Sequence, residues 1–310
     1  MSALGALDYA GLPGWYAAGL PEAEQSEPYI HHFPDGNSTI ARKLVCRLIP
    51  DLVSGNSLEN LITAKLDYGL LDDPRNDVSV RLNSTVINVQ NNKSAGGTVT
   101  VSYVRDNQLE KVSASKCILA CNSNVIPFIC PELPDKQKEA LAFQVKVPIL
   151  YTNVAVKNWE AWKNLGIGAM VCPGSYHIVS MLDFPVTYGN YEFSRNEREP
   201  IVIHMERFPH SYGSNLSARE QYKLGRYELL TTPFETIERN VREQLESSLS
   251  EGGFNAAKDI LGITVNRWSH GYSYWYNPLF DPIYDDYNDS RYPHIIGRKK
   301  YGNITIANAD

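Results

Sequence analysis

An aromatic stretch near the end of the chain holds the side chains with the clearest potential for binding chemistry. Trp268, His270, Tyr272 and Tyr274 follow one another at short spacing in WSHGYSY. The faces of such rings attract organic cations, which indicates a place for a positively charged ligand. The alternative is packing in an aromatic core, which an aromatic content of 11% makes reasonable.

Lys146 is a second candidate, because it lies near the start of the apolar run VKVPILYTNVAVK (145–157). A lysine in such a strand is costly unless its ammonium group reaches the surface or finds a partner. A surface lysine and a lysine that faces a site are both open at this point.

Other catalytic patterns are absent from the sequence. It contains no G-x-G-x-x-G, G-x-x-x-x-G-K-[ST], G-x-S-x-G or H-E-x-x-H motif. The seven histidines are scattered, apart from His31 and His32, and the five cysteines show no C-x-x-C spacing. We therefore expect buried free thiols and no metal site.

Composition excludes two further classes of partner. The formal net charge of -6 argues against nucleic acid, which favours a basic face. No apolar run reaches the 18 or so residues of a membrane span, and the first residues lack the basic region of a signal peptide. As it stands, the chain is expected to be cytoplasmic.

Hydrophobic periodicity predicts a mixed α/β fold. Helices are expected at 40–49, at 134–142 and after Thr232, where Thr232 and Glu235 form a capping-box pattern and Gly252 follows the helix. Strands are expected at 81–90, 98–104, 110–121, 145–157, 167–172, 177–182, 200–206, 263–268 and 303–310. The apolar run 117–121 is typical of a strand buried on both faces of a parallel sheet.

Four segments, read in order, resemble the spermidine dehydrogenase family of FAD-dependent amine oxidoreductases. They are HFPDGNSTIARKLVCRLIP (32–50), NSTVINV with KCILACNSNVIP (83–89 and 116–127), VNRWSHGYSYWYNP (265–278) and IGRKKYGNITIANAD (296–310). The resemblance runs over about residues 10 to 310. It implies a partial Rossmann-like FAD-binding domain (1–130 and 268–310) and a mixed-sheet substrate domain (131–267).

The resemblance also implies roles for single residues. A glycine turn near the flavin ring matches Pro34, Asp35, Gly36 and Asn37, and a strand that meets the adenine matches Val86. The end of a buried strand, where ligands of such sheets bind, places Ala120, Cys121 and Asn122 near the cofactor. The residue matching the acid that opens a helix beside the ribityl chain and pyrophosphate is Asp310.

The remaining matches concern the reaction. Lys146 falls where flavin amine oxidases place a lysine bonded through water to flavin N5, which would make it the catalytic residue. Trp268 would lie beside the flavin, and His270, Tyr272 and Tyr274 would line the substrate cavity. Gly36, Lys146 and Trp268 should then converge on one cleft, and the strand ending in KCILAC should lie beside the strand ITIAN, with their carboxyl ends pointing the same way.

The implied activity is oxidation of a small-molecule amine, such as a polyamine, by hydride transfer to FAD. Because the chain starts and stops abruptly and lacks the dinucleotide fingerprint, we expect a fragment with an N-terminal FAD-binding part missing, which would bind FAD weakly or not at all. Two alternatives stay open: a non-catalytic remnant or split-protein part, and a flavoenzyme with a non-amine substrate. The family often carries a twin-arginine export signal, so a periplasmic location of the complete protein is also open.

Overall fold

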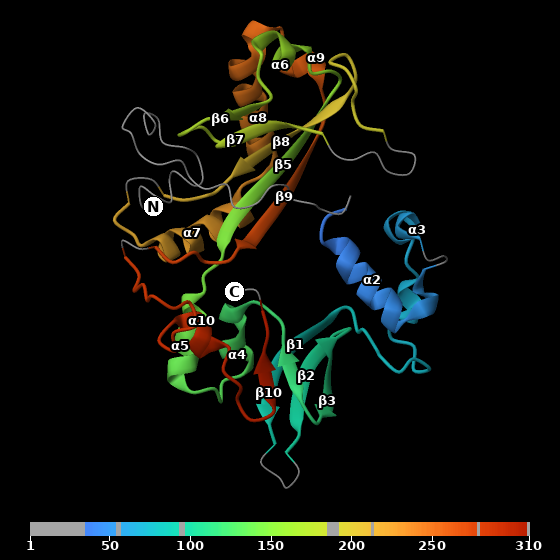
Figure 1. Cartoon of the computed structure of the whole chain (residues 1–310), viewed down its shortest axis with the longest axis vertical. Coiled ribbons are helices and arrows are strands. Elements are labelled where there is room, and N and C mark those ends of the chain that lie inside the picture. Colours follow the sequence, from blue (N-terminus) through green and yellow to red (C-terminus); the bar gives the residue numbers. More distant parts are fainter. Residues whose placement is uncertain are drawn as a thin grey trace. The chain divides into compact units, whose positions relative to one another are not determined.

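The computed structural model describes residues 35–53, 57–92, 97–184, 192–211, 214–277 and 280–308. These residues form two units (Figure 1). The first holds the chain up to Phe143 together with Trp275–Asn308, and the second is Gln144–Tyr274. Both contain helices and strands, so the expected mixed α/β class is confirmed. The break after Phe143 lies one helix later than the expected boundary at residue 130.

The second unit is built on a five-stranded antiparallel sheet with the order β6-β7-β8-β5-β9. Its strands are β5 (Val147–Val156), β6 (Ala169–Val171), β7 (Val179–Asp183), β8 (Ile201–Arg207) and β9 (Ile260–Tyr272). All five lie where the alternation of apolar and polar residues predicted strands, and β9 extends beyond the predicted 263–268 at both ends. The long β5 is the centre of this sheet, because it pairs with both β8 and β9.

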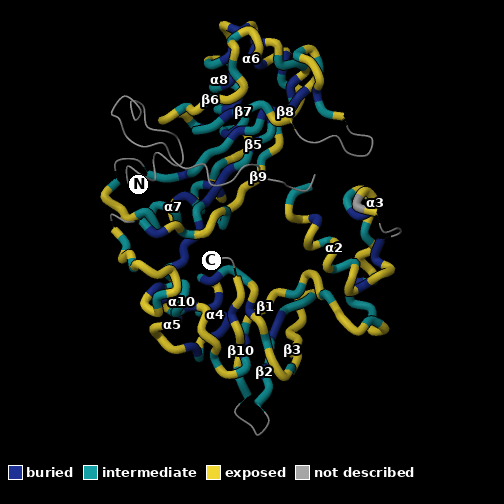
Figure 2. Tube along the Cα trace, in the orientation of Figure 1, coloured by how far each residue is buried: buried dark blue, intermediate teal, exposed yellow. Residues whose placement is uncertain are grey.

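Helices cover one face of this sheet. They are α6 (Glu160–Leu165), α7 (Ala218–Thr231), α8 (Phe234–Leu249) and the short α9 (Ala256–Asp259). Alternate residues of β5 and β8 pack with the apolar stripe of α8 in one cluster, which includes Leu150, Val154, Ile203, Met205, Ile237, Val241, Leu245 and Leu249. Figure 2 shows the buried residues of β5 and its neighbours in dark blue. The predicted helix after residue 232 is therefore confirmed, with its stripe in the core.

The start of α8 differs from the prediction. Thr232 does not cap α8: its hydroxyl donates to the carbonyl of Glu228 (2.8 Å) and thereby closes α7. Pro233 takes the N-cap position of α8, with no side-chain bond. The capping box instead begins α7, where Ser217 and Glu220 bond each other's backbone N–H groups. The short Thr-Pro turn between two helices explains the difference, because the threonine serves the helix before it.

The first unit contains a meander and a separate pair of strands. The meander is antiparallel, with β1 (Ser84–Asn91), β2 (Val99–Arg105) and β3 (Gln108–Ala114). The pair consists of β4 (Cys117–Leu119) and β10 (Ile304–Ile306), which run parallel. This confirms the predicted neighbourhood of the KCILAC and ITIAN strands, which are almost 190 positions apart in the sequence.

Two details of this region differ from the prediction. The expected strand 110–121 is two strands in different sheets, split after Ala114. Furthermore, β4 is not buried on both faces, because Leu119 is buried whereas Ile118 is 68% exposed. Among the described residues β10 is the only strand beside β4, and the meander and helices pack on one face alone.

Short helices complete the first unit. They are α2 (Ser38–Leu48), α3 (Leu58–Thr63), α4 (Ile126–Ile129), α5 (Asp135–Phe143) and α10 (Pro293–Gly297), with 3₁₀ turns at Pro50–Leu52, Tyr68–Leu70 and Ser123–Val125. Gln137 of α5 donates to the carbonyls of Gly297 (2.9 Å) and Lys299 (2.6 Å), which fastens α5 to α10. Asn91 accepts from the backbone N–H of Asn303 (2.8 Å), which ties the meander to β10.

The predicted helices at 40–49 and 134–142 are confirmed by α2 and α5. The apolar side of α2 is largely exposed, however, with Ile40, Leu44 and Leu48 each about half exposed. All five cysteines are free, as expected, but only Cys130 is buried and the other four are partly exposed. Within the described ranges, none of the helices has the length and apolarity that crossing a bilayer requires.

Candidate functional site

The sheet of the second unit has a second face, opposite its helices, and polar and aromatic side chains gather there. Successive strand residues point to opposite faces, so the residues between the buried ones of β5 and β8 lie on this side. They are Tyr151, Asn153, His204 and Glu206, and Tyr151 pairs with Glu206 as Asn153 pairs with His204. We call this side the open face, because its residues on β9 are exposed.

Two tyrosines from β5 and β9 meet on the open face. The hydroxyl groups of Tyr151 and Tyr272 lie 2.9 Å apart, within hydrogen-bond distance. Burial, the bond to Tyr272 and the nearby Glu206 raise the pKa of Tyr151, so its phenol stays neutral. Tyr272 is 55% exposed and Trp268, opposite Ile149, is 54% exposed, so both rings remain accessible to a ligand.

His204 lies at the centre of this group. Its Nδ1 is 2.9 Å from Oδ1 of Asn153, its Nε2 is 3.3 Å from Oε1 of Glu206, and its ring centre is 5.1 Å from that of Tyr151. A ring that carries protons on both nitrogens would donate to both acceptors. Beside His204, the carboxylate of Glu206 is suited to face a cationic group.

Lys146 is buried, with 9% exposure, directly before β5. Its carbonyl accepts from Nη2 of Arg226 (3.1 Å), and Nε of Arg226 donates to the carbonyl of Ser269 (3.0 Å). Arg226 of α7 thus joins the start of β5 to the aromatic stretch of β9. The exposed surface position that was one alternative for Lys146 does not occur.

His270 and Tyr274 do not join the open-face group directly. Nδ1 of His270 lies 2.9 Å from the hydroxyl of Ser269. Tyr274, just after β9, stacks edgewise on Tyr222, and the guanidinium of Arg219 lies 5.5 Å from its ring centre. The cation over Tyr274 is thus a side chain of the protein itself.

The first unit holds the other expected site residues, beginning with the turn before α2. Gly36 has a φ of 69°, a conformation that favours glycine, and a Cβ there would meet no atom within 4 Å. Asp35 accepts from the hydroxyls of Ser38 and Thr39, whereas Asn37 stands at the N-cap without a side-chain bond. Pro34 lies outside the described residues, as does Asp310.

Val86 and the residues after β4 occupy separate places in the same unit. Val86 is 38% exposed on β1, opposite Tyr103 and next to a bulge at Ile87. Such bulges re-aim the backbone of a strand and are frequent near functional sites.

The chain after β4 opens a loop beside β10. Ala120 is exposed, Cys121 accepts at its carbonyl from the side chain of Asn308, and Asn122 opens the 3₁₀ turn that follows. The carboxyl ends of the two parallel strands therefore meet at Cys121 and Asn308. In the part of the chain that the structure describes, no three His, Cys, Asp or Glu side chains gather as a metal site.

Comparisons with known proteins complete these observations. No family model matches the sequence, and no curated protein does either. Among solved structures, a putrescine oxidase triple mutant with redesigned cofactor binding is 15% identical over 74% of this chain and 43% of its own, with a TM-score of 0.48.

Two further matches are similar in kind. Wild-type putrescine oxidase bound to putrescine is 15% identical over 74% of this chain and 43% of its own, with a TM-score of 0.45. Cyclohexylamine oxidase from Brevibacterium oxydans is 12% identical over 72% and 42%, also with a TM-score of 0.45. The chain spans less than half the length of these three structures.

Proposed function

We propose that this chain is part of an FAD-dependent oxidoreductase that oxidises an amine, with polyamines of the spermidine type as the substrate class. The observation that carries the proposal is the parallel pairing of β4 with β10. The sequence resemblance predicts this pairing, and the pairing brings two distant motif segments together. The names of the matching solved structures, putrescine oxidase and cyclohexylamine oxidase, agree with an amine as substrate.

The chain has residues suited to the flat surfaces of FAD but no usual site for its pyrophosphate. The turn at Gly36 is open above its backbone, and Ala120 presents only a methyl group at the end of β4, so flat cofactor surfaces could approach both. The sequence has no glycine-rich turn before a helix, which is the usual site for the pyrophosphate. We therefore propose contacts to the flavin ring and at the strand end, whereas these residues include no glycine-rich turn for the pyrophosphate.

The residues that would hold FAD are those that the resemblance identifies. In the first unit they are Pro34, Asp35, Gly36, Asn37, Val86, Ala120, Cys121 and Asn122, with Asp310 at the end of the chain. When bound, FAD supplies the acceptor for a hydride from the carbon next to the amine nitrogen.

The chain's own residues would bind and orient the amine on the open face. The exposed rings of Trp268 and Tyr272 attract an ammonium group by cation–π contact. Oε1 of Glu206, which lies 3.3 Å from Nε2 of His204, can accept a hydrogen bond from that group. Lys146 would act at the buried start of β5.

A second carboxylate on the open face favours a polyamine over a monoamine. Asp183 is exposed at the end of β7, four residues along the strand from Val179, which pairs with Glu206. Four strand residues span roughly 13 Å. Two carboxylates at that separation suit the two ends of an extended molecule with several amino groups.

The test has two parts. The isolated chain, incubated with FAD and desalted, should retain little of the cofactor's visible absorbance, because it lacks the pyrophosphate turn. The same chain expressed together with the coding sequence directly upstream should retain FAD stoichiometrically, and spermidine should bleach it under anaerobic conditions. Stoichiometric FAD on the isolated chain would contradict the first expectation. Absence of any flavin in the longer protein would favour the non-catalytic alternative.

Lys146→Met in the longer protein should slow the reduction of FAD by the amine without loss of the cofactor. Lys163→Met is the matched control, because Lys163 is an exposed lysine of α6 paired with Glu197. Stopped-flow absorbance measures both rates. Equal rates for wild type and the Lys146 variant would show that Lys146 takes no part in the reaction.

The substrate class has a separate test in the same longer protein. If putrescine, spermidine and a monoamine all fail to reduce the bound flavin, the substrate is not an amine of this kind.

A further inference from the structure

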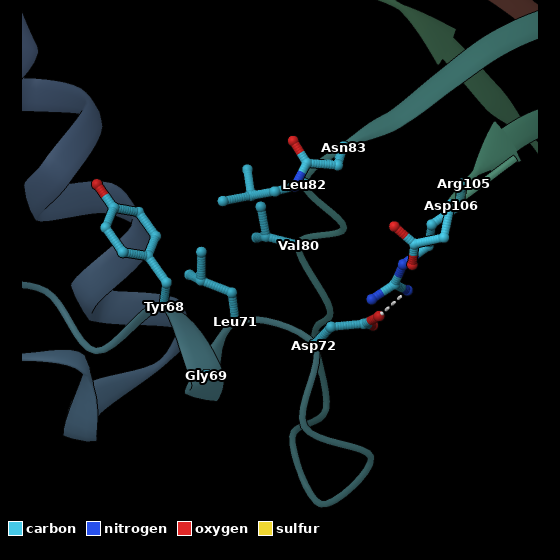
Figure 3. A pocket seen from close by; sticks show the side chains of 9 residues that line it. All are labelled: Tyr68, Gly69, Leu71, Asp72, Val80, Leu82, Asn83, Arg105 and Asp106. Atoms are coloured by element: carbon cyan, nitrogen blue, oxygen red, sulfur yellow. Dashed lines mark hydrogen bonds and ion pairs between the residues drawn. The ribbon is translucent and has the colours of Figure 1, made fainter.

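The first unit contains a pocket that the proposed function does not use. It lies between the 3₁₀ turn Tyr68–Leu70, the chain leading into β1 and the start of the β2–β3 turn, and its volume is about 380 Å³. Apolar side chains of Leu71, Val80 and Leu82 line its middle (Figure 3). Tyr68 lies at one end, and Arg105 and Asp106 lie at the other.

Arg105 keeps hydrogen-bonding capacity at the charged end. Its Nη1 donates to Asp72 (2.6 Å), which also accepts from Nε of Arg81 (3.1 Å). Among the described residues, Nε and Nη2 of Arg105 have no partner, and the side chain is 34% exposed. A guanidinium with two donors left over is suited to a carboxylate, which it can bind through two parallel bonds.

Asp106 adds an acceptor of opposite charge beside Arg105. It forms a two-residue turn with Asn107, and both have positive φ (48° and 60°), so the position of Asp106 is set by the tight hairpin. Its carboxylate forms no hydrogen bond with another described residue and lies next to Arg105 in Figure 3. The charged end thus presents a donor pair and an acceptor side by side.

The charges around the pocket decide which ligand it suits. Asp72 is shared by two arginines, so its charge is already neutralised. The remaining groups, one guanidinium and one carboxylate, are complementary to a ligand that carries both signs close together. A simple anion would be repelled by Asp106, and a simple cation by Arg105.

We propose that this pocket binds a free α-amino acid with an apolar side chain. Its carboxylate accepts from Arg105 and its ammonium group donates to Asp106. The side chain lies over Leu71, Val80 and Leu82 and points toward the ring of Tyr68. In this arrangement the polar groups of the pocket fix the orientation of the ligand, and three apolar side chains contact the rest of it. It does not depend on the proposed amine oxidation.

Isothermal titration calorimetry of the full chain with L-leucine and L-phenylalanine tests the proposal. We expect a dissociation constant of about a millimolar or below for at least one of them, as the size of the ligand allows. L-leucinamide lacks the carboxylate and 4-methylpentanoate lacks the ammonium group, and each should bind at least tenfold more weakly. No binding of either amino acid at millimolar concentration, or an analogue that binds as tightly as the amino acid, would overturn the proposal.

Variants of the charged end provide the second part of the test. Arg105→Met and Asp106→Asn should each weaken binding at least tenfold, and Arg105→Lys keeps the charge as a check if the methionine variant unfolds. Arg75→Met is the matched control, because Arg75 forms an equivalent pair with Asp73 (2.5 Å) outside the pocket. Equal loss of binding in the Arg75 variant, or full binding by Arg105→Met with an unchanged circular dichroism spectrum, would also overturn it.

Discussion

Replacing His177 should remove a large part of the acid sensitivity of the second unit. His177 is fully buried directly before β7, and its Nε2 lies 3.0 Å from the hydroxyl of Thr152. Gln244 of α8 bonds both its backbone N–H (2.9 Å) and its carbonyl (2.8 Å). Nδ1 has no partner among the described residues, so nothing there stabilises a second proton. Burial, followed by the charges of Arg207 and His204, lowers the pKa of His177 from 6.5 to about 3.

The sign of the effect follows from proton linkage. Because the pKa is lower in the folded state than in the unfolded state, the unfolded chain binds more protons between these values. Stability is therefore fully present above pH 6.5 and is lost as the pH falls toward 3. At pH 5 the loss amounts to about 2 kcal/mol, and a folded pKa one unit higher changes this figure very little. The full loss below pH 3 would be about 5 kcal/mol.

Urea unfolding at pH 5, 6.5 and 8 measures this effect, with the fluorescence of Trp159, Trp162 and Trp268 as the signal from the second unit. His177→Gln keeps a partner for Thr152 but has no group that titrates in this range. Its free energy of unfolding should therefore fall by about 2 kcal/mol less than that of wild type between pH 8 and pH 5. Leu230→Ala, an exposed position of α7 in the same unit without a titratable group, is the control and should keep the wild-type slope. Parallel pH profiles for wild type and the His177 variant would refute the reasoning.

Four further substitutions test the packing of the same unit by urea unfolding. Leu245→Ala should lower the free energy of unfolding by about 2–5 kcal/mol, because Leu245 is fully buried under the sheet. Leu230→Ala should lower it by less than about 0.5 kcal/mol, because Leu230 is 77% exposed on α7. Similar losses for the two variants would mean that Leu245 is not part of the core. Ser217→Ala should cost about 1 kcal/mol through loss of the α7 capping box, and no change would mean that the cap is not formed in solution. Gly225→Ala should cost about 1–3 kcal/mol, because its Cβ would collide with the carbonyl of Pro209, and a neutral effect would show that α7 can shift away.

The parts of the fold that the sequence predicts best are those where local pattern and tertiary packing demand the same thing. The stripe of α8 and the alternation of β5 are both necessary for the core of the second unit, so their positions could be read from the residue types alone. The pairing of β4 with β10 is a different case. Nothing local joins Cys117 to Ile304, and only the order of the motif segments predicted their contact.

The predictions failed where the same residues were compatible with two different local arrangements. Thr232 is a reasonable cap for either neighbouring helix, and the side-chain bond to Glu228 rather than the spacing to Glu235 decides between them. The apolar run at β4 predicted burial on both faces. Such burial requires other elements packed against each face of the strand, and a run of five residues does not show whether those elements exist. Ile118 is therefore exposed although its residue type is that of a core strand.

The open face shows how far a candidate site can be recognised from the sequence alone. Tyr151 and Asn153 alternate with buried residues of β5, and His204 and Glu206 do the same on β8. Polar residues at every second position of a strand usually mean only that one side faces water, so neither strand is unusual by itself. The site depends on register: β5 and β8 must pair so that Asn153 stands opposite His204. A shift of β8 by one residue would turn His204 and Glu206 into the core, where they could not be satisfied. The same polar residues that form the candidate site therefore also help to determine the register that creates it.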